Sequence, residues 1–198
     1  MTSVDRKPGR PRDQSVEPAV TRAVLEILED VGPGALNMDE VAARAGVSKA
    51  TIYRRWDSKE DLIVDAIVSL VSKVQPPEGP DIRVVLVTML KRLRTFMSAG
   101  TGGSIFPWLV GEVSSGTDLG RHYAEAVILP RRQMIARVIA EGIERGDLRP
   151  DLDVEVAVDM VTGPAILRKL MGSFRDHDDD WEEKLVDGLL LGWRAKGI

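Results

Sequence analysis

The hydrophobic positions of this chain recur mostly at intervals of three and four residues, the spacing of one face of an α-helix. The first such stripe runs from Val20 to Val31 and ends at Gly32-Pro33-Gly34, because glycine caps a helix in the left-handed conformation and proline does not continue it. Alternating polar and apolar runs, which would indicate strands, are hard to find. We therefore predict an all-α fold.

Three short helices are expected next, each after a residue whose side chain can accept a hydrogen bond from the first N–H groups of the helix. The predicted N-caps are Asn37, Ser48 and Ser58, for helices over about residues 38–45, 49–56 and 59–74. Glu40 is spaced to complete a capping box with Asn37, and Gly46 separates the second helix from the third.

Five longer helices are predicted after Gln75-Pro-Pro-Glu-Gly-Pro80, a stiff turn that is the best candidate boundary in the chain. They cover about residues 81–98, 104–113, 118–145, 153–172 and 179–195, which makes about nine helices in all. Pro130 and Pro164 fall inside two of them and are expected to kink them. Residues 100–104 are glycine-rich like a phosphate-binding loop, but they lack the Gly-Lys-Ser/Thr ending and a preceding strand, so we expect a plain loop.

Composition narrows the class of protein. The chain has 198 residues, 43% of them hydrophobic, as in a globular protein with a sizeable core. It has no cysteine, so disulfides and thiolate metal sites are excluded. No apolar run approaches the ~18 residues of a membrane span, and the first residues lack the apolar segment of a signal peptide. We therefore expect a cytoplasmic protein with no membrane partner.

The charge distribution favours a nucleic-acid partner more than the net charge of −4 suggests. Segments 6–12 and 41–56 each contain four basic residues and no acidic one. Such local patches can attract a polyanion even on an acidic protein, although a solvated surface is the simpler explanation of a few arginines.

The second basic segment has the pattern of a helix-turn-helix. Two short helices meet at Ala45-Gly46-Val47-Ser48, where glycine permits a tight turn and serine caps the next helix. In such a motif the second helix enters the major groove of DNA. Ile52 and Trp56 would face the core, and the residues expected to face outward are Lys49, Thr51, Tyr53, Arg54 and Arg55.

The segment from Met38 to Ile63 resembles the tetracycline-repressor (TetR) family of bacterial regulators. It contains, in order, the family's Ala-Gly-Val-Ser turn, Thr-Ile-Tyr, an aromatic residue and Ser-Lys-Glu. Residues 141–151 and Thr162-Gly-Pro164 resemble one C-terminal subclass of that family. The resemblance implies a three-helix helix-turn-helix domain over residues 16–58. The fourth helix would join it to a helical ligand-binding and dimerisation domain over residues 59–198.

The resemblance also implies roles for individual residues. Positions that match base-facing residues of the family are Lys49, Ala50 and Tyr53, and those that match phosphate contacts are Ser48, Thr51, Arg54 and Lys59. Ala50 offers only a methyl group, so base reading would depend on Lys49 and Tyr53. Arg44, at the end of the second helix, is a further candidate DNA contact.

Residues 1–15 form a basic arm that we expect to be disordered without DNA. Its alternating arginines and prolines exclude a helix, and Arg10 and Arg12 belong to a Gly-Arg-Pro segment that resembles the AT-hook type of minor-groove binder. The alternative is a solubilising tail with no role in recognition.

The C-terminal helices supply two further sets of apolar residues. The first set would line a pocket for a ligand: Leu86, Met89, Leu90, Leu93, Phe96, Met97, Phe106, Trp108, Leu109, Tyr123, Val127 and Met134. The second would pair the last two helices with those of a second copy: Met160, Ile166, Leu170, Trp181, Leu185, Leu189 and Trp193. Gly188 and Gly192 would let that copy approach closely. Ordinary core packing is the competing explanation for both sets.

No pattern indicates catalysis, a cofactor or a metal site. Residues 176–180 are rich in aspartate but lack the spacing of a calcium loop, and the two histidines, His122 and His177, belong to no catalytic set. We predict a homodimeric transcriptional regulator of double-stranded DNA with a palindromic operator. A repressor released by an unidentified small apolar ligand is favoured. Two alternatives remain: a helix-turn-helix protein without a small-molecule effector, which a fully packed C-terminal domain would favour, and a helical enzyme.

Overall fold

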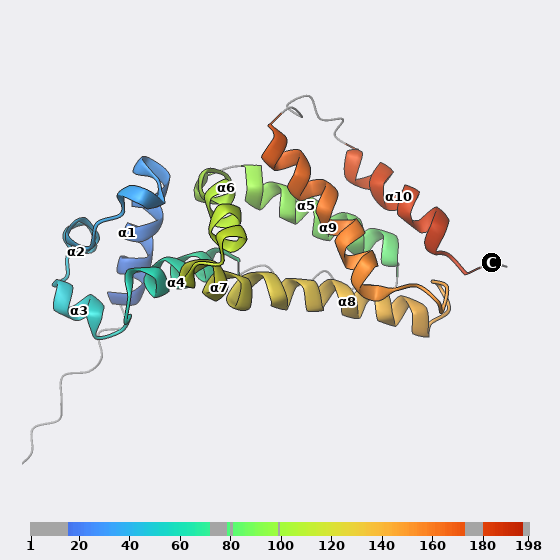
Figure 1. Ribbon diagram of the computed structural model, residues 1–198, viewed down its shortest axis with the longest axis horizontal. Helices are drawn as coiled ribbons and strands as arrows, with labels where there is room; N and C mark the ends of the chain where they lie inside the picture. Colours follow the sequence, from blue (N-terminus) through green and yellow to red (C-terminus); the bar gives the residue numbers. More distant parts are fainter. Residues whose placement is uncertain (1–15, 72–78, 80, 99, 173–179, 196–198) are drawn as a thin grey trace, which may run out of the picture.

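The computed structural model describes residues 16–71, 79, 81–98, 100–172 and 180–195, and these residues are almost entirely helical (Figure 1). They form ten α-helices, a short 3₁₀ turn (Pro33–Ala35) and a π-helical turn, η2 (Ala124–Ile128), with no strand among them. α7 (Asp118–Tyr123), η2 and α8 (Leu129–Glu144) continue into one another with helical backbone angles, so the helices form nine rods. The all-α prediction with about nine helices is confirmed.

The N-terminal helices pack around one apolar core. α1 (Val16–Val31), α2 (Met38–Ala45) and α3 (Lys49–Tyr53) lie at one end of the molecule, and α4 (Lys59–Val71) leads away from them toward the other helices (Figure 1). Val24 of α1, Ile52 of α3 and Ile63 of α4 are fully buried in this core. α3 has only five residues, too few to be stable alone, so this packing holds it in place.

The predicted caps form, with one difference. The side chain of Asn37 accepts a hydrogen bond from the N–H of Asp39 at 2.8 Å, and Ser58 accepts one from Asp61 at 2.9 Å. Glu40 does not complete a capping box within the described hydrogen bonds, because its carboxylate accepts from Arg44 at 2.7 Å. α3 is shorter than predicted, since the chain forms a turn after Tyr53.

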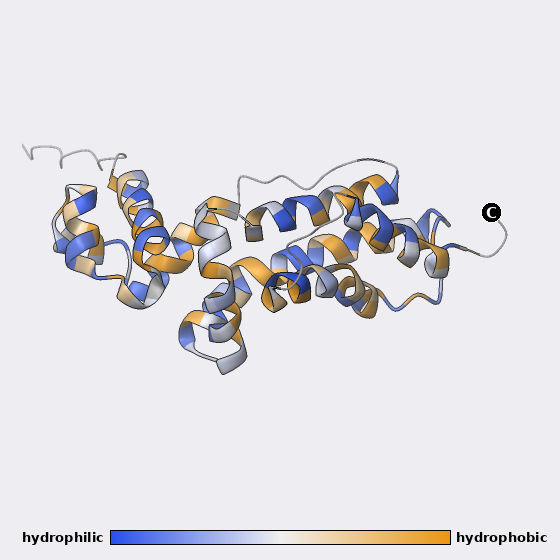
Figure 2. Ribbon diagram, turned by 90° about the horizontal axis from the view of Figure 1, so that it is seen from above, coloured by the Kyte–Doolittle hydropathy of each residue, from blue (hydrophilic) through white to orange (hydrophobic). Residues whose placement is uncertain are grey.

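The remaining helices form a second bundle. α5 (Ile82–Ser98), α8 and α9 (Val154–Met171) pack on one another, α10 (Trp181–Trp193) lies along α5, and α6 (Gly100–Ser115) joins this bundle to α1 (Figure 1). Hydrophobic and hydrophilic residues alternate around the helices, as expected for helices with one apolar face (Figure 2).

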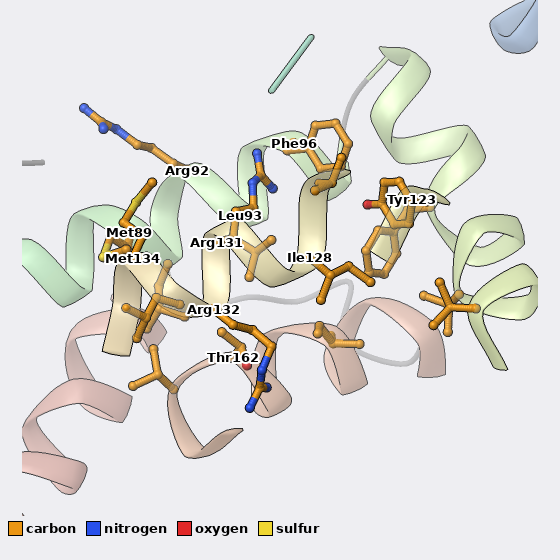
Figure 3. A pocket seen from close by; sticks show the side chains of 18 of the residues that line it. Met89, Arg92, Leu93, Phe96, Tyr123, Ile128, Arg131, Arg132, Met134 and Thr162 are labelled. Carbon is orange, nitrogen blue, oxygen red and sulfur yellow. The ribbon is translucent and has the colours of Figure 1, made fainter. Parts of the chain in front are cut away.

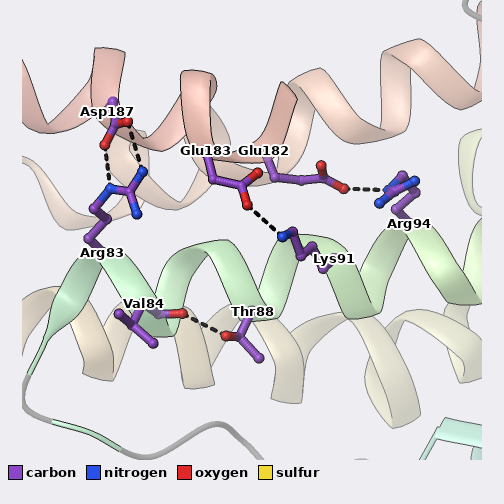
Figure 4. A network of polar contacts seen from close by, with 8 residues as sticks. All are labelled: Arg83, Val84, Thr88, Lys91, Arg94, Glu182, Glu183 and Asp187. Atoms are coloured by element: carbon purple, nitrogen blue, oxygen red, sulfur yellow. Dashed lines mark hydrogen bonds and ion pairs between the residues drawn. The ribbon is translucent and has the colours of Figure 1, made fainter. Parts of the chain in front are cut away.

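A row of ion pairs ties α10 to α5 (Figure 4). The pairs are Arg83 with Asp187, Lys91 with Glu183, and Arg94 with Glu182. The first two are exposed or half-buried, whereas the Glu182 side chain is 0% exposed. These pairs lie on the face of α10 that is turned toward α5.

The prediction of a plain loop over residues 100–104 is wrong, because these residues form the first turn of α6. A β-carbon at Gly102 would collide with the carbonyl oxygen of Phe96, at the end of α5. The glycines therefore serve a close crossing of two helices, and α6 begins earlier than the apolar spacing suggested.

The two prolines placed inside helices have different surroundings. Pro130 stands in the first turn of α8, directly after the π-helical turn, where the N–H of Leu129 bonds the carbonyl of Ala124. A proline has no N–H to bond a carbonyl four residues earlier, so the wider turn before it accommodates Pro130. Pro164 lies within α9, which is helical on both sides of it.

Candidate nucleic-acid interface and ligand pocket

α3 presents a polar face to solvent. Lys49, Ala50 and Arg54 are exposed, and Tyr53 keeps 50% of its surface accessible, whereas Ile52 on the opposite side is fully buried. An exposed tyrosine ring and lysine on a braced helix are suited to base edges and thymine methyl groups. The outward positions predicted from the sequence therefore lie together on one surface.

Acidic neighbours hold several of the basic residues near this surface. Lys49 pairs with Asp39 of α2 at 2.7 Å, and both side chains are exposed. Arg44 donates to Asp30 at 2.8 Å and to Glu40 at 2.7 Å, and these hydrogen bonds, the Asp30 bond first, raise the pKa of Arg44. Arg44 points its guanidinium at two carboxylates, so its predicted contact with DNA requires an exchange of partners.

A hydroxyl pair lies at the start of α3. The Oγ of Ser48 and the Oγ1 of Thr51 are 2.9 Å apart, and Arg54 donates to the same Thr51 oxygen at 3.2 Å. Ser48 also accepts from the N–H of Thr51 and so caps the helix as predicted. Exposed hydroxyls, a guanidinium and helix N–H groups are donors that suit a phosphate.

The other predicted DNA contacts lie at the margins. Lys59 is half-buried at the start of α4, where its Nζ donates to the carbonyl of Leu36 at 3.5 Å. Arg10 and Arg12 lie outside the described residues, as does the rest of the arm over residues 1–15.

A cavity of about 340 Å³ lies between α5, α6, α8 and α9, with walls that are mainly apolar (Figure 3). This volume is within the range of small-molecule sites. The lining residues that the sequence predicted are Met89, Leu90, Leu93, Phe96, Phe106, Tyr123, Val127 and Met134. The lining residues that it did not predict as pocket residues are Leu70, Arg92, Val110, Val113, Ser114, Ile128, Arg131, Arg132, Ile135, Val161, Thr162 and Ile166.

Four predicted pocket residues lie elsewhere. Leu86, Met97 and Leu109 are buried in the cores, and Trp108 is half-buried against the N-terminal core. Apolar character does not separate a pocket wall from a packed core. Arg131 could have been predicted as a pocket residue from the sequence. It is spaced to share a helix face with Val127, Ile128 and Met134, and a single arginine on an apolar helix face is a candidate for the wall of a pocket.

The predicted dimer residues differ in their exposure. Trp181 and Trp193 are buried in the core of their own chain, and Ile166 lines the pocket. Leu185 and Leu189 are half-buried. Met160 and Leu170 are exposed on α9, and the same exposed stripe contains three residues that the sequence did not indicate, Val156, Leu167 and Met171.

α7 connects the pocket to α4. Tyr123 lines the cavity and is also part of the N-terminal core, to which α4 contributes Leu62 and Ile63. On the outer side, the Nδ1 of His122 lies 3.0 Å from a carboxylate oxygen of Asp61. α7 therefore contacts both the cavity and α4, the helix that follows α3.

Two family models match the chain. The model for bacterial regulatory proteins of the tetR family matches residues 20–66, and the model for the tetracyclin repressor-like C-terminal domain matches residues 76–189. The chain belongs to the tetracycline-repressor (TetR) family. Its members are transcriptional regulators, and this TetR-family protein is a DNA-binding transcriptional regulator.

Similar proteins match this TetR-family chain along nearly its whole length. An uncharacterised helix-turn-helix transcriptional regulator of Bacillus subtilis, YdeS, is 33% identical over 96% of this chain and 95% of its own. The DNA-binding transcriptional repressor TetR of Mycobacteroides abscessus is 28% identical over 91% and 94%. The crystal structure of the TetR family transcription regulator SCO0332 is 33% identical, with a TM-score of 0.73 over 90% of this chain and 98% of that one.

Other kinds of site are not indicated among the described residues. No group of three or more histidine, aspartate or glutamate side chains there is placed to hold a metal ion, and of the acidic run 176–180 only Asp180 is described. No described helix is long and apolar enough to cross a membrane.

Proposed function

We propose that this TetR-family regulator is a homodimeric repressor that leaves a palindromic operator when a small, mainly apolar ligand fills the pocket. The observation that carries the proposal is that one side chain, Tyr123, belongs both to the pocket wall and to the core shared with α4. The pocket and the DNA-reading helix are thus joined by packed elements.

In this proposal, α3 enters the major groove, where some residues read base edges and others contact phosphates. Lys49 and Tyr53 read base edges, while Ala50 meets a thymine methyl group. Positioning on the phosphates falls to Ser48, Thr51, Arg54 and Lys59, with Arg44 as a further contact and Arg10 and Arg12 in the adjacent minor groove. Lys49 gives up its exposed pair with Asp39 when it binds, at a cost of about 0.2–1 kcal/mol.

The exposed faces of α9 and α10 supply the dimer interface. Leu167 is 57% exposed within a stripe of apolar side chains on α9, and Leu191 is exposed on α10. Apart from the neighbouring backbone of α10 itself, a β-carbon at Gly188 or Gly192 would meet no atom of the described residues within 4 Å. Glycine inside a helix costs roughly 1 kcal/mol relative to alanine, so a partner helix crossing at these positions gives both glycines a structural role.

Ligand response follows from the connection through α7. A ligand against Tyr123 and the π-helical turn biases the position of α7, and α7 carries α4 with it through the shared core and the His122–Asp61 contact. The two α3 helices then no longer fit successive major grooves. The ligand can shift the dimer only by as much as it prefers the released conformation.

In vitro selection of duplexes from a random pool tests the DNA part of the proposal. We expect a twofold-symmetric site whose half-sites lie about one helical turn, ~34 Å, apart or a multiple of that distance. Selection of asymmetric sites, or of no consensus, would contradict it.

Sedimentation of Leu167→Glu tests the dimer. We expect the wild-type dimer to dissociate in this variant while its helicity is preserved. The matched control is Val84→Glu, because Val84 is also apolar and 56% exposed but points away from α10 on the outer side of α5 (Figure 4). Equal behaviour of the two variants would place the interface elsewhere.

A further inference from the structure

Arg131 is a charged residue in an otherwise apolar part of the pocket wall. Its guanidinium lies 5.5 Å from the centre of the Phe96 ring, and burial lowers its pKa without removing its charge at neutral pH. Within the described part of the chain, no carboxylate pairs with Arg131 and no hydrogen bond is made by its guanidinium. The Phe96 ring compensates only part of the lost hydration.

The other two arginines of the wall are arranged differently. Arg132 is neutralised by Glu155 and Asp159 of α9, which hold its guanidinium beside Thr162 (Figure 3). Arg92 is exposed, and its side chain extends away from the other labelled residues (Figure 3). None of the described residues that line the cavity is acidic. The wall therefore has an uncompensated positive charge at Arg131.

Tyr123 adds a hydrogen-bond donor next to this charge. Its hydroxyl makes no hydrogen bond to the described residues, and it lies on the side of the ring that faces Arg131 (Figure 3). Burial raises the pKa of Tyr123, against the opposing effect of the Arg131 charge, so the phenol is protonated and can donate. Met89 and Met134 line the cavity on the side of Arg131 away from Tyr123 (Figure 3).

We infer that the ligand of this pocket is an amphipathic organic acid, whose carboxylate binds Arg131 and Tyr123 and whose apolar body lies toward Met89 and Met134. One unpaired guanidinium and one hydroxyl match the single charge and the acceptor oxygens of a carboxylate. A phosphate dianion would need a second unpaired cation. The inference rests on the proposed function, because it takes this cavity to be the effector site.

Matched ligand pairs test the inference directly. Binding of decanoate and decanamide, and of 4-phenylbutyrate and 4-phenylbutanamide, is measured by calorimetry on the full-length protein at neutral pH. Each pair has the same apolar body and differs in the charge of the head. We expect the carboxylate to bind at least tenfold more tightly than its amide in a pair that fits the cavity.

Variants assign this preference to Arg131. We expect Arg131→Met to bring the two members of a pair within about twofold of each other, while Arg92→Met, the matched control on the same wall, keeps the tenfold preference. Tyr123→Phe should reduce the preference without abolishing it. Circular dichroism establishes that each variant is folded, and the comparison on the wild-type protein does not depend on any variant.

The outcomes separate this inference from the proposed function. Equal or tighter binding of the amides, or no binding of any member of either pair, would overturn the inference. If an amide nevertheless released the protein from the selected operator duplex, the proposed function would stand although the inference of an acid ligand would be wrong. Conversely, tight carboxylate binding that left operator affinity unchanged would support the acid site and contradict ligand-controlled repression.

Discussion

The ion pair between Arg94 and Glu182 gives the clearest prediction about stability. Glu182 is 0% exposed, one of its carboxylate oxygens accepts from Arg94, and the other has no described hydrogen-bond partner (Figure 4). Removing one partner of a buried pair leaves an uncompensated charge and typically costs about 3–5 kcal/mol. The Arg94 side chain is 31% exposed, so water can reach part of the vacated site. We therefore expect Arg94→Met to lower the free energy of unfolding by about 3 kcal/mol, the lower end of that range.

Urea unfolding at one fixed protein concentration measures this change, because stability of a dimer depends on concentration. The control is Arg83→Met on the same face of α5, whose pair with Asp187 is exposed on both sides and should matter much less. The double variant Arg94→Met/Glu182→Leu should recover most of the loss, since it removes the buried charge as well. If Arg94→Met were no more destabilising than Arg83→Met, the Glu182 charge would not be buried as described.

Two further predictions concern charges elsewhere. Asp39→Asn should strengthen DNA binding severalfold, because the substitution frees Lys49 and removes a negative charge from the interface. Fluorescence anisotropy measures the affinity, and unchanged or weaker binding would contradict the prediction. The hydrogen bond from Arg83 lowers the pKa of Asp187, so this carboxylate stabilises the fold fully above its unfolded pKa of about 4 and progressively less as the pH falls below it. The unfolding free energy of Arg83→Met should consequently fall less steeply than that of the wild type between about pH 5 and pH 2, and parallel curves would refute this assignment.

The features that the sequence predicted well are those decided by neighbouring residues. The caps at Asn37, Ser48 and Ser58 depend on a side chain and N–H groups two or three residues away, and the left-handed Gly46 depends on its own backbone. The inward and outward faces of α3 follow from the helical spacing alone. These local rules therefore predict the order of the first four helices and the outward face of α3.

The features that the sequence did not predict depend on contacts between distant segments. Whether Gly102 is helical depends on how closely α6 crosses the end of α5. Trp181 and Trp193 belong to an apolar stripe that would suit a partner equally well, and their burial depends on the packing of α10 along α5. Arg131 is desolvated, whereas its neighbour Arg132 forms an ion pair with Glu155. This difference also depends on where α5 and α9 meet α8.

The most direct test of sequence reading by α3 compares Tyr53→Ala with the wild type on the selected operator and on a scrambled duplex. Since Tyr53 is half exposed on the outer face of α3, we expect the variant to lose about 1–3 kcal/mol of binding free energy on the operator and almost none on the scrambled duplex. Lys59→Ala, a phosphate-contact control, should weaken both alike. An equal loss on both duplexes for Tyr53→Ala would contradict sequence reading by this helix.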